Sequence, residues 1–212
     1  GSGQITMAGT AGTLNNVAIV NTNVSGVTPS SGWDMTGKFS ISSNSIFNAS
    51  SYSYTVGTDI ESDGTLNGGS STFTMNSTDG TLTGSPVTFF NHFSIGTAAL
   101  VTANSDFSVA GNYTNNGTYD GTIGNLTMTG SAAATIGGTP VSNALSQLII
   151  AKTGGATVTM AVGLIDVFTL YIQSGTLFTS TYGITQDVTG GFLIIDDGAT
   201  LRLGGTNSLP AF

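Results

Sequence analysis

The chain has 212 residues, of which 39% are hydrophobic and only 7% are charged, and three basic against 11 acidic residues give a net charge of −8. Disordered chains combine low hydrophobicity with high charge, so this composition predicts a folded protein. Three basic residues cannot neutralise a nucleic-acid backbone or hold the chain on anionic lipids. The longest apolar stretch, residues 161–172, is too short to span a bilayer. Nucleic acid and membrane insertion are therefore excluded from the expected partners.

Short apolar alternations recur along the whole chain and are separated by Gly, Asn, Asp and Ser. In chain order they are Phe39/Ile41, Phe73/Met75, Phe93/Ile95, Leu126/Met128, Leu148/Ile150, Leu170/Ile172 and Leu201/Leu203. Alternation over three to five residues predicts half-buried strands, and the residues between them favour turns. No window keeps the spacing of an amphipathic helix, so the sequence predicts an all-β fold.

Similar strings also recur at one larger offset. Phe73-Thr74-Met75 and Leu126-Thr127-Met128 are offset by 53 positions, and Pro86 and Pro140 are offset by 54. A fixed offset of this size indicates an internal repeat of about 54 residues. We place its two copies at residues 52–105 and 106–160, in a single module over residues 1–212. Neither end has an obvious cap, so a fragment of a longer chain is expected.

A fixed offset favours a solenoid, because each turn must bury its apolar face against the next turn. The sequence predicts a parallel β-solenoid of about ten turns, each of roughly 18 to 27 residues, a range set by dividing the offset into two or three. Tandem β-sandwich repeats of the immunoglobulin-like kind are the alternative, because the repeat unit is longer than one turn.

Four segments resemble the repeats of large secreted bacterial surface proteins, namely residues 14–19 (LNNVAI), 36–41 (TGKFSI), 111–119 (GNYTNNGTY) and 195–201 (IDDGATL). This adhesin-like group is similar to the passenger regions of autotransporters. The resemblance implies a right-handed parallel β-helix with a structural or adhesive role outside the cell. It indicates the fold better than any ligand.

Metal binding has one candidate, formed by Asp59, Glu61 and Asp63 ahead of Gly64. Oxygen ligands at alternate positions before a Gly resemble the first half of a calcium loop. The twelfth position of that loop should be a bidentate acid but is Ser70 here, so an acidic turn is the competing interpretation. Calcium is the one cofactor considered, and otherwise none is expected.

Carbohydrate binding also has one candidate, Trp33, the only Trp in the chain. If it lies on a loop that leaves the solenoid, its ring could stack on a sugar. The competing interpretation, which we favour, is that Trp33 packs on the core. Thr-x-Thr pairs of the kind that ice-binding solenoids align share no turn period here; they are Thr72/Thr74, Thr81/Thr83 and Thr157/Thr159.

Catalytic chemistry is not indicated. The only histidine, His92, lies in an alternating segment as an outward strand residue would. The only adjacent acidic pair, Asp196-Asp197, precedes a Gly, as in a turn. A polysaccharide-cleaving β-helix is therefore a weaker hypothesis than a non-enzymatic one.

These observations predict an extracellular, cell-surface, structural or adhesive module that acts as a stalk or scaffold. The alternative is a self-assembling subunit of a filament or surface layer, since an open solenoid end presents unpaired strand edges. The expected partners are neighbouring repeats, copies of the same chain and surface glycans.

Overall fold

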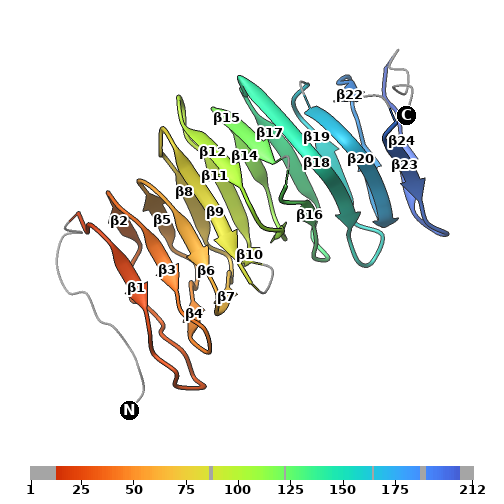
Figure 1. Cartoon of the computed structure of the whole chain (residues 1–212). Coiled ribbons are helices and arrows are strands. Elements are labelled where there is room, and N and C mark those ends of the chain that lie inside the picture. The colour runs from red at the N-terminus through yellow and green to blue at the C-terminus, as the bar shows by residue number, and fades with distance from the viewer. Residues whose placement is uncertain (1–12, 86–87, 122, 164, 187–189, 206–212) are drawn as a thin grey trace.

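A computed structural model describes residues 13–85, 88–121, 123–163, 165–186 and 190–205. In this part of the chain the structure consists of strands and turns without a helix. The strands pair in parallel with strands of the next turn and stack into a β-solenoid of about eight turns (Figure 1). The all-β solenoid prediction is thus confirmed. Sandwich repeats are excluded, because sandwiches are built from antiparallel strands.

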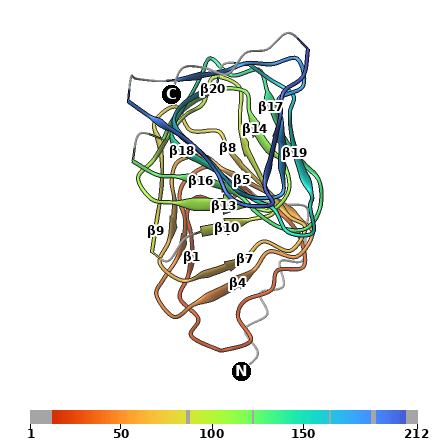
Figure 2. The same ribbon diagram turned by 90° about the vertical axis from the view of Figure 1, so that its right-hand side faces the viewer.

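Each turn contributes to three faces of the solenoid. Face A is one sheet of nine strands: β2 (Trp33–Met35), β5 (Ser53–Val56), β8 (Thr72–Met75), β11 (His92–Ile95), β14 (Tyr113–Asn115), β17 (Ala134–Gly138), β19 (Thr157–Met160), β21 (Thr176–Phe178) and β24 (Thr200–Arg202). Figure 2 shows the strands arranged around a closed cross-section.

The other two faces are connected in the second half of the molecule. Face B contains β1 (Val17–Ile19), β3 (Phe39–Ile41), β6 (Ile60–Ser62), β9 (Gly80–Gly84), β12 (Leu100–Ala103), β15 (Thr118–Gly121) and β22 (Ile184–Gln186). Face C contains β4 (Ile46–Asn48), β7 (Thr65–Asn67), β10 (Thr88–Phe90), β13 (Phe107–Val109), β16 (Leu126–Met128) and β23 (Phe192–Ile195). The ten-residue strands β18 (Ser142–Ala151) and β20 (Ile165–Ser174) run through both faces.

The turns vary in length. On face B, Asp120 is stacked between Thr102 and Ala144, so the turn that leads to Asp120 is clearly shorter than the turn that follows it. Ten turns were expected and about eight are seen. Long turns account for the difference, because the turns from Ala134 to Val158 and from Thr176 to Thr200 are as long as the one that ends at Ala144.

The larger sequence offset does not relate stacked positions. Phe73-Thr74-Met75 lies on β8 of face A, whereas Leu126-Thr127-Met128 lies on β16 of face C. The stacked partner of Phe73 is Phe93, on the very next turn of face A. Pro86 falls outside the described residues. The similar strings therefore reflect similar strands on different faces.

The interior is a continuous apolar core. On face A, five aromatic residues stack in register on successive turns, in the order Trp33, Tyr54, Phe73, Phe93 and Tyr113. All five are at most 4% exposed. The rings of Tyr54 and Phe73 are stacked, with centroids 4.7 Å apart and planes inclined by 22°. Burying one such side chain stabilises the fold by about 1.5–3 kcal/mol, so this column is a main source of cohesion between turns.

The described residues form no helix that is long and apolar enough to cross a membrane.

Candidate functional site

The three faces present different chemistry to solvent. Outward residues of face A in the first five turns are neutral and polar apart from Asp34 on β2; the neutral ones are Ser53, Thr55, Thr72, Thr74, His92, Ser94, Asn112 and Thr114. Face B carries charged groups, including Lys38, Asp59, Glu61, Asp120 and Asp166. Face C is more apolar, with Phe89 51%, Phe192 60% and Ile194 41% exposed.

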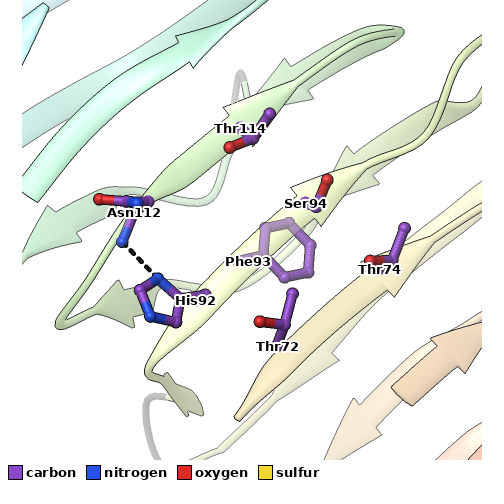
Figure 3. A pocket seen from close by; sticks show the side chains of 7 residues that line it. All are labelled: Thr72, Thr74, His92, Phe93, Ser94, Asn112 and Thr114. Carbon is purple, nitrogen blue, oxygen red and sulfur yellow. Dashed lines mark hydrogen bonds between the residues drawn. The ribbon is translucent and has the colours of Figure 1, made fainter. Parts of the chain in front are cut away.

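A shallow hollow of about 360 Å³ lies on face A across β8, β11 and β14 (Figure 3). It is lined by Thr72, Thr74, His92, Phe93, Ser94, Asn112 and Thr114. The side chain of Phe93 is buried in the core, so only its main chain can contribute to the floor. The hollow is therefore surrounded by hydroxyl, amide and imidazole groups.

Strand register sets the positions of these groups. Thr55, Thr74, Ser94 and Thr114 are stacked partners on four successive turns, and neighbouring strands are about 4.8 Å apart. Their hydroxyls form one row along the solenoid axis, which we call the hydroxyl row. Thr72, His92 and Asn112 form a second row two residues earlier in each strand.

His92 is held in one orientation. Its Nδ1 accepts a hydrogen bond of 2.9 Å from the backbone N–H of Asn112 (Figure 3). This contact uses Nδ1 as an acceptor, which leaves Nε2 as the ring's hydrogen-bond donor. A Cβ on Gly111 would lie only 2.5 Å from Cε1 of His92. Glycine at this position therefore makes room for the ring.

The next turn repeats this corner contact. The side-chain Oδ1 of Asn112 accepts a hydrogen bond of 3.0 Å from the backbone N–H of Thr135. His92 and Asn112 thus each bind the backbone of the following turn, which fixes one side of the hollow. By contrast, the hydroxyls of Thr74, Ser94 and Thr114 make no hydrogen bond to any described protein group, so they are available to a ligand.

The candidate calcium ligands lie on a strand instead of a loop. Asp59, Glu61 and Asp63 are alternate residues along β6 and its flanks, so the first and last are about 13 Å apart at 3.3 Å per residue. Asp59 Oδ1 accepts hydrogen bonds from the N–H and hydroxyl of Thr81. Glu61 forms an ion pair with Lys38. Within the described residues no group of three potential ligands could hold a metal ion, so the calcium-loop hypothesis does not fit this geometry.

Trp33 begins strand β2 and points into the core. Its side chain is 4% exposed and packs against Phe47 and Tyr54, with ring centroids 5.3 and 5.7 Å away. The ring has no free face on which a sugar could stack. Trp33 thus lies in the core, where the favoured interpretation placed it, and offers no exposed ring to a sugar.

The remaining candidates also have structural surroundings. Asp196-Asp197 follows β23 in a turn whose Gly198 has a φ of +79°. Asp196 Oδ2 accepts a hydrogen bond of 2.6 Å from the Tyr171 hydroxyl, which raises the pKa of Tyr171. The guanidinium carbon of Arg202 lies 3.7 Å from the centroid of the Phe178 ring, its stacked partner on face A. Arg202 therefore makes a cation–π contact with this ring.

Sequence reasoning missed two polar features inside the solenoid. Lys152 is fully buried, and its amine donates hydrogen bonds to the carbonyls of Ala110 and Thr129. Asn143 is 1% exposed, and its Oδ1 accepts a hydrogen bond of 3.0 Å from the Tyr113 hydroxyl. A lone Lys after a strand and an Asn at an inward position of β18 are the only signals that the sequence offered.

By its fold this chain is a parallel β-solenoid repeat protein. No family model, characterised protein or solved structure matches it significantly.

Proposed function

We propose that this chain is a non-enzymatic structural and adhesive module of an extracellular protein, acting as a stalk or scaffold at the cell surface. The observation that carries the proposal is the unbroken stack of face A, in which nine strands pair turn upon turn. Each turn is bound to the next by backbone hydrogen bonds, and the first five are also joined by the aromatic column. Such a stack gives a semi-rigid rod that lengthens by about 4.8 Å for each added turn.

The surface chemistry supports a role outside the cell. Only 7% of the residues are charged, and the outward positions on β5, β8, β11 and β14 of face A are Ser, Thr, Asn and His. The side chains at the corners bind the neighbouring turn, as Asn16 Oδ1 does with the backbone N–H of Lys38 at 2.8 Å. These side-chain hydrogen bonds at the corners join successive turns, as expected of a scaffold.

The location can be tested with antibodies raised against the purified chain. Immunogold labelling of intact cells of the source should decorate their surface without permeabilisation. A cytosolic protein of the same cells, labelled in parallel, should appear only after permeabilisation. Labelling of this chain that requires permeabilisation would reject the extracellular proposal.

The role can be tested by deletion. Removing residues 33–202 from the native protein should preserve its export and reduce attachment of the cells to surfaces or to each other. Unchanged attachment with normal export would contradict a stalk or adhesive role.

Self-assembly is a second candidate, favoured by the outward apolar side chains of the turn that contains β23, where Phe192 is 60% and Ile194 41% exposed. If copies associate through this turn, sedimentation velocity should show larger species as concentration rises. Phe192→Asp should abolish them, and Phe89→Asp, which alters another exposed aromatic residue of face C, should leave them. A monomer at all concentrations would remove this candidate.

A further inference from the structure

We propose that the hollow on face A is a binding site for a neutral polysaccharide that lies along the solenoid axis across β8, β11 and β14. The proposal deepens the adhesive function above and rests on it. It assigns the contact to the hydroxyl row and to His92, and not to the only tryptophan, which is buried.

The first argument is the arrangement of the groups. The hydroxyls of Thr74, Ser94 and Thr114 lie on three successive turns in strict register. Each can both donate and accept a hydrogen bond, and none is used by the described part of the protein. Sugar hydroxyls have the same dual character, so a row of them can be bound by a row of threonine and serine side chains.

The second argument is the shape of the site. Small-molecule pockets enclose most of their ligand, whereas this hollow is shallow and open along the stack (Figure 3). It spans three strands, about 10 Å between the outer two at 4.8 Å per step. An extended chain that continues beyond the hollow fits this shape better than a compact ligand does.

The third argument is charge. The lining residues include no Asp, Glu, Lys or Arg, and His92 Nδ1 accepts a hydrogen bond from the Asn112 N–H, which leaves Nε2 to donate. The chain as a whole carries a net charge of −8. An anionic polymer would be repelled by this net charge and would find no lysine or arginine in the hollow, so the ligand class is a neutral glycan.

The two rows are too irregular for a rigid lattice such as ice. The hydroxyl row is interrupted after Thr114, because the next stacked residue is Gly137, which has no side chain. The second row contains His92 and Asn112, which are larger than its threonine, Thr72. A flexible glycan can adapt its hydroxyls to such unequal partners, whereas a lattice requires identical ones.

The test uses sedimentation of the purified chain with insoluble cellulose, chitin, β-1,3-glucan and starch, and with calcium pectate gel as an anionic control. We expect retention on at least one neutral glycan, none on pectate, and no loss of retention at high ionic strength, where charge-based binding would weaken. Failure to bind any of the four neutral glycans would overturn the proposal. Thermal hysteresis without glycan retention would reassign the face to an ice-like lattice.

Two matched triple variants locate the site. Thr74→Ala, Ser94→Ala and Thr114→Ala together remove the three hydroxyls of the hydroxyl row that line the hollow and should weaken retention at least tenfold. Thr83→Ala, Thr102→Ala and Thr127→Ala together remove three outward hydroxyls of β9, β12 and β16 on faces B and C and should change retention less than twofold.

Equal behaviour of the two triple variants would overturn the proposal. Circular dichroism melting of both variants separates lost binding from lost folding. Surface labelling of cells is independent of these results, so failure of the glycan site and failure of the extracellular scaffold role can be told apart.

Discussion

The side-chain amine of Lys152 donates a hydrogen bond of 2.6 Å to the backbone carbonyl of Ala110, which lies 42 residues earlier in the chain. The same amine donates to the carbonyl of Thr129, 23 residues earlier. Ala110 follows β13 and Thr129 follows β16, so Lys152 connects three successive turns at one corner. Lys152 is 0% exposed, and no carboxylate of the described residues forms an ion pair with it.

Replacing Lys152 should weaken the stack. Lys152→Met keeps the length of the side chain but leaves two carbonyls without their donor, and one unsatisfied buried group costs about 1–3 kcal/mol. We expect the free energy of unfolding in urea to fall by about that amount. Lys38→Met is the control, because the Lys38–Glu61 pair is exposed and such pairs contribute about 0–1 kcal/mol. Equal effects of the two variants would contradict a bracing role for Lys152.

The stability of the protein should also depend on pH through Lys152. Burial lowers the pKa of Lys152 below 10.5, and a neutral amine has two N–H groups for its two carbonyls. Between the lowered pKa and 10.5 the unfolded chain binds more protons than the folded one, so stability rises with pH in that window. Melting temperatures measured from pH 7 to 10 should increase for the native protein and less for Lys152→Met.

Buried tyrosines should reverse this trend above pH 10. Burial raises the pKa values of Tyr54, Tyr113 and Tyr119 above 10.0. The unfolded chain then loses tyrosine protons that the folded chain keeps, so stability falls as pH rises further. Both the native protein and Lys152→Met should show this loss, and its absence from either would contradict the burial of these hydroxyls.

The strands could be predicted from the sequence, but their stacking could not. Alternation such as Phe93/Ile95 indicates two inward residues on any face. The 53-residue offset between the similar strings on β8 and β16 therefore relates two different faces and does not give the length of a turn. The aromatic column at Trp33, Tyr54, Phe73, Phe93 and Tyr113 does carry the true turn spacing of face A. Turns of unequal length hide this period elsewhere.

The candidate site shows the same limit. Thr74 and Thr114 are ordinary outward residues until register places them on either side of Ser94. The acidic residues around β6 suggested a loop because Asp-x-Glu-x-Asp-Gly also suits a calcium site, but β6 pairs with β3 and β9 and extends the chain. Sequence spacing cannot distinguish these cases, because it contains no information on contacts between turns.

A buried polar network around Asn143 should contribute measurably to the stability of the fold. Asn143 Oδ1 accepts hydrogen bonds from the Tyr113 hydroxyl at 3.0 Å and from Asn115 Nδ2 at 3.3 Å. Asn143→Ala leaves both donors buried without that acceptor and opens a cavity, so we expect a loss of about 2–4 kcal/mol in unfolding free energy. Tyr113→Phe removes one of the donors, so adding Asn143→Ala to it should cost less than Asn143→Ala alone. Strictly additive losses would show that the two groups are not coupled.

A substitution at Gly111 tests whether the orientation of His92 contributes to glycan binding in the hollow. A Cβ at this position would come within 2.5 Å of Cε1 and 2.6 Å of Nδ1 of His92, so Gly111→Ala must displace the ring and break its hydrogen bond to the Asn112 N–H. We expect glycan retention to fall severalfold while the melting temperature drops by only a few degrees, since one net hydrogen bond is worth about 0.5–1.5 kcal/mol. Gly183→Ala is the control, because nothing lies within 4 Å of a Cβ at that position. If Gly111→Ala retained glycan as well as Gly183→Ala does, the orientation of His92 would have no part in binding.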